Sequence, residues 1–397
     1  MNYNDVVSLE EITTELSDGL HKAPVFIPNG EYIFVNAKNL VNGYIADVDP
    51  EKHTSYEEYC KYKSPIGNRT ILYSIDGTIG NLARYRGEKC VLGKGACYIN
   101  VQENIDLDYV YYVLQSDHFK SYIRQMSTGS TIKHISLKTM RNYKFVLPQE
   151  SEQKKIAGIL KSIDDKIETN TRINDKLEQQ AQTIFRAWFM EYVPFGGALP
   201  VDWTSSTLGD ICSCELGGTP SRAKPEYWNG NIPWINSGEV NRFRITKPSE
   251  MITELGLSQS ATKLLPVKTT VIAITGATLG QVSLLEIASC ANQSVVGVVP
   301  NTQLPYEFLY PFIKANIQEL ISHQTGGAQQ HINKQNVESL PIVFPSKEVL
   351  KEYIGLVGGF YTMIANNCFE NERLSGIRDS LLSRLISCEI DVSQIDI

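Results

Sequence analysis

Two short stretches of the sequence keep one frame of Thr, Gly, His and Ile around different polar residues. The first runs from Thr128 to Ile135 as TGSTIKHI, and the second runs from Thr325 to Ile332 as TGGAQQHI. Gln can hydrogen-bond adenine bidentately and Lys can bond guanine, so these residue types suit the reading of base edges. Because the two His residues recur with the frame, a role in capping a helix or filling the core is favoured for them. The candidates for base contacts are Lys133, His134, Gln329, Gln330 and His331.

Two glycine turns provide a second set of candidates. The segment DGTIGN contains Thr78 and Asn81, and the segment GATLGQ contains Thr278 and Gln281. Such turns can bring backbone and hydroxyl groups close to a phosphate. The geometry of the turn alone would equally explain their glycines.

Each half of the chain also has a basic run that could contact phosphate groups. Such runs are usually solvated surface, which is the alternative interpretation. The residues are Lys61, Lys63 and Arg69 in the first half, and Arg222, Lys224, Arg242 and Arg244 in the second.

Signatures of catalysis and of metal binding are missing from the sequence. It has neither the Asn/Asp-Pro-Pro-aromatic loop of an adenine methyltransferase nor a Gly-x-x-x-x-Gly-Lys-Ser/Thr loop for ATP. The eight Cys and six His show no zinc spacing and suggest no metal cluster. We therefore expect a chain that carries no cofactor or metal and catalyses no reaction by itself.

The candidate residues lie in a sequence that contains an internal repeat. Thr78 and Gly80 return as Thr278 and Gly280, at nearly the same offset that relates the two Thr-Gly-His-Ile frames. Two copies indicate an internal duplication and a pseudo-twofold protein, because a solenoid needs more repeats.

Each copy combines short apolar runs and turn signals with one long helix. The runs RTILYSI, CYINV and YKFVLP in the first copy, and TTVIAIT, QSVVGVVP and LPIVFP in the second, are typical of strands. Residues 106–126 and 304–323 have helical periodicity. The predicted fold class is α+β, with two pseudo-twofold-related α/β domains separated by a pair of long antiparallel coiled-coil helices. The predicted boundaries are 1–150 for the first domain, 151–193 for the first helix, 194–346 for the second domain, 347–387 for the second helix and 388–397 for a C-terminal tail.

The two long helices carry an apolar seam whose spacing alternates between four and three residues, as in a coiled coil. The seam over residues 156–188 recurs over residues 353–385, with Arg378 as its one charged position. A polar residue in a seam fixes register, and each helix has two Asn in the middle of its seam. Two amphipathic helices on separate cores are the alternative. Antiparallel helices would bring these Asn residues together in two pairs, Asn170 with Asn371 and Asn174 with Asn367. Parallel pairing would also match Asn with Asn, but the pseudo-twofold duplication favours the antiparallel arrangement, which puts the two domains at opposite ends.

Length and charge limit the class of protein. A chain of 397 residues favours two domains, and a net charge of -7 argues mildly against nucleic acid, although a basic face on each domain is permitted. No apolar run approaches the ~20 residues of a membrane span, and the polar first residues do not form a signal peptide. We expect a cytoplasmic protein that binds no membrane.

Two similar domains on a helical spacer, called head one and head two below, suit a polymer with two half-sites, of which duplex DNA is the obvious one. A frame that is kept while its contents differ fits this interpretation. The frame would position the backbone, and the variable residues would read bases.

On these features the chain resembles the specificity (S) subunit of a type I restriction-modification system. The resemblance covers essentially the whole chain. It rests on FVLPQESEQKKIAGILKSIDDKIETN, on the Thr-Gly-x-x-x-x-His-Ile frame, and on the segments INSGEV and TGATLGQV. The second copy departs from the pattern, since FPSKEVLKEYI lacks the Glu-Gln pair and Arg378 interrupts its seam.

The resemblance implies two target recognition domains that each read half of a split site in double-stranded DNA. It implies two methylation subunits, which carry S-adenosylmethionine and methylate adenine, and restriction subunits, which use ATP and magnesium to translocate and cleave. This chain would be the non-catalytic subunit on which those partners dock. The alternatives are a stand-alone two-headed DNA-binding protein and a coiled-coil scaffold whose heads bind proteins.

The end of the first helix, IFRAWFMEYVPF, is unusually aromatic. It has more aromatic surface than one seam can use, so we expect a partner-docking surface there. Packing onto head two is the alternative. The residues concerned are Phe185, Trp188, Phe189 and Tyr192.

Overall fold

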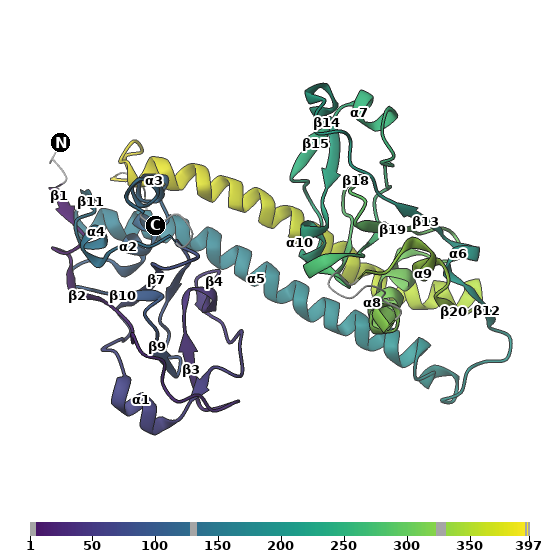
Figure 1. Cartoon of the computed structure of the whole chain (residues 1–397), viewed down its shortest axis with the longest axis horizontal. Coiled ribbons are helices and arrows are strands. Elements are labelled where there is room, and N and C mark those ends of the chain that lie inside the picture. Colours follow the sequence, from purple (N-terminus) through teal and green to yellow (C-terminus); the bar gives the residue numbers. More distant parts are fainter. Residues whose placement is uncertain (1–4, 128–132, 323–330, 394, 396–397) are drawn as a thin grey trace. The chain divides into compact units, whose positions relative to one another are not determined.

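The computed structural model describes residues 5–127, 133–322, 331–393 and 395, and its chain forms two compact units. Unit 1 comprises residues 1–165 and 374–397, and unit 2 comprises residues 166–373. The two long helices, α5 (Glu150–Phe189) and α10 (Lys347–Ile386), therefore each contribute to both units (Figure 1). Head one is the part of unit 1 that precedes α5, and head two is the part of unit 2 between α5 and α10.

Head one is built on two sheets and two short ribbons. Its main sheet is antiparallel, in the order β2 (Thr13–Asp18), β10 (Ala96–Val101), β7 (Thr70–Ser74) and β8 (Leu82–Arg84). The second sheet has the order β6 (His53–Thr54), β3 (Tyr32–Val35) and β9 (Cys90–Leu92), in which β3 is antiparallel to the first and parallel to the last. The ribbons pair β1 (Asp5–Ser8) with β11 (Lys144–Leu147), and β4 (Leu40–Val41) with β5 (Tyr44–Ile45).

The segment 106–126, predicted as one helix, is two helices in the structure. A break at Ser116 separates them, because its hydroxyl donates to the carbonyl of Val113 and accepts from the N–H of Phe119. A Ser side chain used in this way caps a new helix instead of continuing the old one. The helices of head one are α1 (Tyr56–Tyr62), α2 (Leu107–Val113), α3 (Asp117–Met126), α4 (Leu137–Arg141) and the 3-10 turn η1 (Ala37–Asn39).

Head two repeats the strand arrangement of head one. Its main antiparallel sheet has the order β13 (Ser213–Leu216), β19 (Val295–Val299), β16 (Thr270–Ala273) and β17 (Val282–Leu284). In the second sheet, β14 (Trp228–Ile235) is antiparallel to β15 (Glu250–Ile252) and parallel to β18 (Cys290–Ala291). The ribbon pairs β12 (Thr204–Thr207) with β20 (Pro341–Phe344). The same topology in both heads confirms the duplication predicted from the sequence.

The helices of head two are short, with one exception. The long one is α8 (Tyr306–Ser322), which covers the predicted helical segment 304–323. The others are α6 (Leu208–Ile211), α7 (Glu254–Ser258), α9 (Lys334–Glu338) and the 3-10 turns η2 (Val193–Phe195), η3 (Pro225–Tyr227), η4 (Ser237–Asn241) and η5 (Gly276–Thr278).

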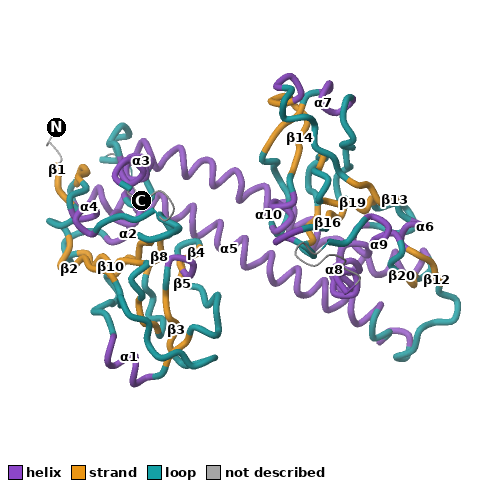
Figure 2. The backbone as a smooth tube through the Cα atoms, in the orientation of Figure 1, coloured by secondary structure: helices purple, strands orange, loops and turns teal. Residues whose placement is uncertain are grey.

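The long helices α5 and α10 are continuous in the backbone trace (Figure 2) and antiparallel within unit 2. Asn170 donates to the amide oxygen of Asn371 at 2.9 Å, and Asn367 donates to that of Asn174 at 2.8 Å. These are the two pairs expected for antiparallel helices. Asn170 and Asn174 are buried, so each pair satisfies polar atoms that water does not reach.

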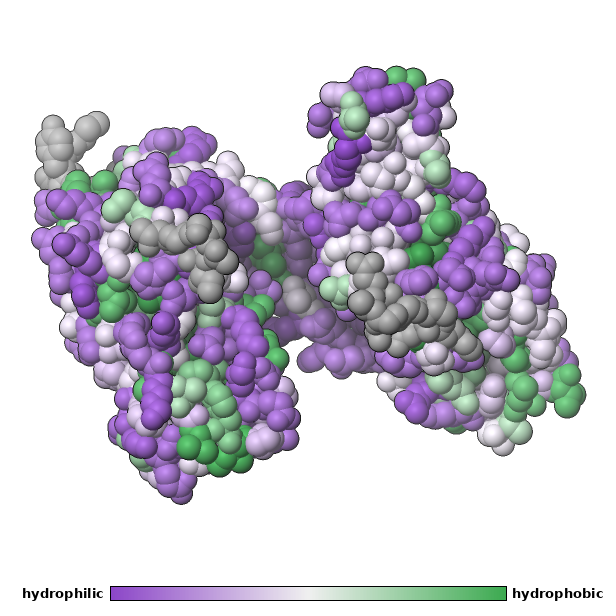
Figure 3. Space-filling model, in the orientation of Figure 1, coloured by the Kyte–Doolittle hydropathy of each residue, from purple (hydrophilic) through white to green (hydrophobic). Residues whose placement is uncertain are grey.

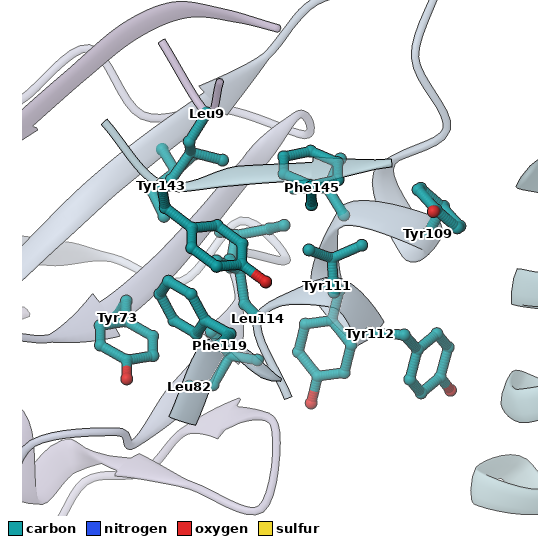
Figure 4. Packing of buried hydrophobic residues seen from close by; sticks show 14 of the residues in the cluster. Leu9, Tyr73, Leu82, Tyr109, Tyr111, Tyr112, Leu114, Phe119, Tyr143 and Phe145 are labelled. Carbon is teal, nitrogen blue, oxygen red and sulfur yellow. The ribbon is translucent and has the colours of Figure 1, made fainter. Parts of the chain in front are cut away.

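Each unit has a core that includes both long helices. In unit 1, aromatic side chains of α2, α3 and the neighbouring strands pack together, among them Tyr73, Phe119 and Tyr143 (Figure 4). The same core contains Ile156 and Leu160 of α5 and three residues of α10, which are Leu382, Leu385 and Ile386. Head one is thus completed by residues from the far end of the chain.

Candidate nucleic-acid interface

In head one, the glycine turn and the His loop lie side by side. The Gly77 N–H donates to the carbonyl of Lys133 at 3.1 Å, and the Ile135 N–H donates to the carbonyl of Ile75 at 3.0 Å. Between them, Nδ1 of His134 lies 2.5 Å from Oδ1 of Asp76, and because a carboxylate only accepts, Nδ1 donates. Two segments predicted separately as DNA contacts therefore form one surface.

Head two joins its turn and loop in the same way. Thr275 and His331 form an antiparallel bridge, and the Ile332 N–H donates to the carbonyl of Ile274 at 3.1 Å. Gly276 and Gly280 have φ of 66° and 82°, a left-handed conformation that favours glycine. The two candidates Gln329 and Gln330 lie outside the described residues.

The polar residues of the turns differ in how far they are free to contact DNA. Thr78, Lys133 and Gln281 are exposed. Asn81 is half-buried, and its amide donates to the carbonyl of Ala37 at 2.8 Å, so its side chain fixes the turn onto η1. Thr278 is also half-buried and donates to the Thr275 carbonyl at 3.3 Å.

Most of the predicted basic residues are on the surface. Lys61 and Lys63 are exposed at the end of α1, and Lys61 lies over the ring of Tyr62. Arg222 is exposed, lies 3.6 Å from the ring centre of Trp228, and donates to Glu250. The exposed Lys224 donates to the hydroxyl of Tyr227, and the exposed Arg242 pairs with Glu239 at 3.3 Å.

Two arginines have structural roles instead. Arg69 donates from Nε to the backbone carbonyl of Val101 and from Nη2 to those of Gln102 and Ile105, so its side chain is fastened to head one. The side chain of Arg244 is fully buried and pairs with Glu178 of α5 at 2.7 Å. An interior ion pair contradicts the prediction that Arg244 contacts phosphate. The prediction was wrong because the local sequence does not show whether an arginine is exposed to solvent or buried against an acidic residue from a distant part of the chain.

The aromatic end of α5 packs onto head two, which was the alternative to a docking surface. Phe185 and Phe189 belong to the core of unit 2, where Phe189 lies 4.8 Å from the rings of both Phe308 and Tyr353. Trp188 and Tyr192 are half-buried against the same core. Buried residues cannot dock a partner, so the prediction is corrected for Phe185 and Phe189.

Exposed apolar residues occur elsewhere on the helices, where the sequence reading missed them. In unit 2, Leu356 and Met363 are one heptad apart on α10 and are 49% and 50% exposed. Phe369 on α10 and Ile173 on α5 are also exposed. Their heptad spacing on the outward side of a paired helix was a usable signal, because residues beyond the seam have no function in the pair.

Within the described residues, no group of three or more His, Cys, Asp or Glu is placed to hold a metal ion. None of the helices that these residues form is both long and apolar enough to span a bilayer. The faces visible in Figure 3 are largely hydrophilic, with apolar residues in small separate areas.

Two heads of one topology, each with a turn and a loop joined at the surface, define a class of protein with two similar recognition sites. The chain matches the family described as Type I restriction modification DNA specificity domain over residues 4–179 and again over residues 200–354. It belongs to this family.

Two relatives and one solved structure agree with this assignment. The chain is 25% identical over 341 residues to the type I restriction enzyme MjaIX specificity subunit of Methanocaldococcus jannaschii, covering 82% of this chain and 78% of that protein. It is 24% identical over 357 residues to the type I restriction enzyme HindI specificity subunit of Haemophilus influenzae, covering 71% and 77%. The crystal structure of a type I restriction-modification system S subunit from M. genitalium has the same fold, with a TM-score of 0.58, 18% identity, and coverage of 97% and 96%.

The chain is therefore a DNA specificity subunit of a type I restriction-modification system, which confirms the predicted fold class and function. Specificity subunits are the non-catalytic recognition part of such systems, as predicted. They work in a complex with other subunits and with DNA.

Proposed function

We propose that the chain reads a split site in double-stranded DNA, with one half-site for each head. The observation that carries this proposal is the joined turn and loop, which occurs once in each head with different polar residues. A shared backbone frame would place both heads on DNA alike, while the differing side chains would select different bases.

The residues of the joined surface have distinct proposed roles. Lys133 and His134 in head one, and His331 in head two, are proposed to contact bases. The same role is proposed from the sequence for Gln329 and Gln330, which lie outside the described residues. Thr78 and Gln281 contact the phosphate backbone, and the exposed basic residues of each head add further phosphate contacts. Asn81 and Thr278 shape the turns. The exposed basic residues proposed to contact phosphate are Lys61, Lys63, Arg222, Lys224 and Arg242.

The proposed partners are two methylation subunits and the restriction subunits. Exposed Leu356 and Met363 on α10 support a docking surface for a methylation subunit on the helix pair. Two exposed apolar side chains one heptad apart are spaced to pack against a helix of a partner protein. The chain itself carries no cofactor in this proposal. The methylation subunits bring S-adenosylmethionine, the restriction subunits use ATP and magnesium, and the complex acts in the cytoplasm.

The methylome tests the proposal. Adenine methylation is mapped across the genome in cells that express this chain with its partner subunits, and in cells from which its gene is deleted. Loss of one split motif on deletion is the expected result, and it would give both half-sites and the spacer. An unchanged methylome with the partners present would contradict the proposal and favour a stand-alone DNA-binding protein or a scaffold.

A further inference from the structure

Head two is fastened to α5 by charged side chains in the interior of unit 2. Glu178 of α5 is 6% exposed and accepts hydrogen bonds from Arg244 at 2.7 Å and from Lys314 of α8 at 3.0 Å. The buried guanidinium of Arg244 also donates to the Tyr310 hydroxyl at 3.0 Å and lies 3.6 Å from Glu286. The side chains of Glu178 and Arg244 are buried, and Lys314 lies at their edge with a partly exposed side chain. We call Glu178 and Arg244, together with Lys314, the buried charge cluster.

Arg244 begins a short segment, residues 244–247, that contacts both long helices. Thr246 donates to Glu372 of α10 at 3.3 Å, and Lys247 pairs with the same carboxylate. Ile245, between them, is held by the sheet of head two, since its N–H donates to the Leu284 carbonyl at 3.1 Å. The segment therefore connects the sheet of head two to α5 and α10 together.

A buried ion pair resists sliding in a way that apolar packing does not. If one partner moves, the other is left as an uncompensated charge in the interior, which is strongly unfavourable. Neighbouring residues of an α-helix differ by about 1.5 Å in height and about 100° in direction, so only the position of Glu178 faces Arg244 correctly. The buried charge cluster thus gives head two one place and one orientation on α5.

DNA imposes a similar step size on a split site. One added base pair in the spacer moves a half-site by about 3.4 Å and turns it by roughly a tenth of a full turn. A head that is fixed to better than this step rejects the altered spacer. A head that is held by apolar packing alone can adjust to it.

Head one is fastened by different residues. In unit 1, Asp164 of α5 accepts from the Tyr112 hydroxyl at 2.7 Å and from Arg378 at 2.9 Å. The side chains of Arg378 and Asp164 are 24% and 26% exposed, so this attachment is in partial contact with water. The buried charge cluster is therefore particular to head two and does not follow from the duplication.

We propose that Glu178, Arg244 and Lys314 determine how strictly the protein discriminates between spacer lengths in its split DNA site. They are positioning residues that contact no base and act by fixing head two on the helix pair. This inference rests on the proposed reading of two half-sites.

The test uses the chain co-expressed with the methylation subunit of its own system, in a host that lacks adenine methylation, with all methylated motifs read by sequencing. The variants are Glu178→Gln and Lys314→Met. Lys263→Met is the matched control, because Lys263 pairs with Glu215 inside head two and not with a long helix.

The wild type and the control should methylate one motif with one spacer length. In Glu178→Gln, we expect the same half-sites to be methylated also with a spacer one base pair longer or shorter, at least about tenfold more than in the wild type, because a tenfold change needs only part of the free energy of a buried ion pair. Lys314→Met should shift in the same direction and by less, since the pair of Glu178 with Arg244 remains.

A single unchanged spacer in both variants would overturn the inference, and so would a changed half-site sequence. If Glu178→Gln fails to fold, Lys314→Met decides by the same criterion. If the wild type itself yields no split motif, the proposed function fails first, and the inference fails with it.

Discussion

Asn367 donates a hydrogen bond of 2.8 Å to Asn174, from one long helix of unit 2 to the other. Asn174 is 2% exposed, so water cannot replace a lost partner. Asn174→Ala should lower the free energy of unfolding by about 1–3 kcal/mol, the usual cost of a buried polar group left unpaired. Urea denaturation would measure it. The double variant Asn174→Leu with Asn367→Leu should regain most of the loss, and equal stability of Asn174→Ala and wild type would refute the role of the pair.

Glu178 should make the stability of unit 2 depend on pH in the acid range. Burial alone would raise the pKa of Glu178, but Arg244 and Lys314 outweigh it and lower that pKa from 4.5 to about 2. A carboxylate whose pKa is depressed by folding stabilises the protein above its unfolded pKa and loses this effect as the pH falls through the folded value.

We therefore expect the stability advantage of the wild type over Glu178→Gln to be constant above about pH 5 and to shrink by about 3 kcal/mol as the pH falls from 4.5 toward 2. Chemical denaturation at a series of pH values would measure both proteins. A difference that does not vary with pH would show that the carboxylate is not paired as described.

Lys133 is proposed to read a base, and its loss should alter only one half-site. Lys133→Ala in the complex with the methylation subunit should relax one position of that half-site by about 1–3 kcal/mol. Methylation of a library of site variants would measure this, with Lys120→Ala on α3 as the control of equal charge. An equal loss of affinity for all site variants would instead identify a phosphate contact. In that case the slope of log affinity against log salt concentration should fall by about one.

Met363 is proposed to belong to the docking surface for a methylation subunit. Met363→Glu should weaken assembly, because it puts a charge into an apolar contact. Thr362→Glu adds the same charge at the adjacent exposed position and is the control. Co-purification of the methylation subunit would compare them. Equal recovery with both variants would place the docking surface elsewhere.

Leu385 is 1% exposed in the core of unit 1, although it lies near the end of the chain. Leu385→Ala should destabilise unit 1 by about 2–5 kcal/mol, the range for a buried Leu. Hydrogen exchange should show faster exchange in residues 5–127 and little change in head two. Leu356→Ala, on the same helix but half-exposed, should be close to wild type in stability. Equal loss of protection in both heads would contradict this division.

The sequence predicted most where one local pattern decided the outcome. The seam of α5 and α10 placed Asn170 opposite Asn371, because heptad spacing selects the residues that face the other helix and the two Asn in the middle of each seam fix the register. The duplicated frame likewise showed two heads of one topology. It did not show that the glycine turn and the His loop join, since Gly77 and Lys133 are far apart in sequence and meet only through the sheet.

The predictions that were wrong concern residues whose packing partners are far away in the sequence, where no local pattern reveals them. Arg244 resembles other surface arginines until Glu178, on a helix before head two, is brought against it. Phe185 and Phe189 were recognised as an excess of aromatic surface, and what covers them is head two itself. Burial of this kind is decided by tertiary packing and not by residue type.

Unit 1 contains head one, which is synthesised first, and the last part of α10, which is synthesised after unit 2. When a ribosome has released the whole of head one, the side chains of Leu382 and Leu385 that complete its core have not yet been made. Unit 2 ends at Arg373, so the second copy is available for packing earlier than the first. Newly made domains usually fold in the order of synthesis. In this chain the core residues of unit 2 have all been made by Tyr361, whereas the core of unit 1 still lacks Leu382, Leu385 and Ile386, so unit 2 can complete its core first.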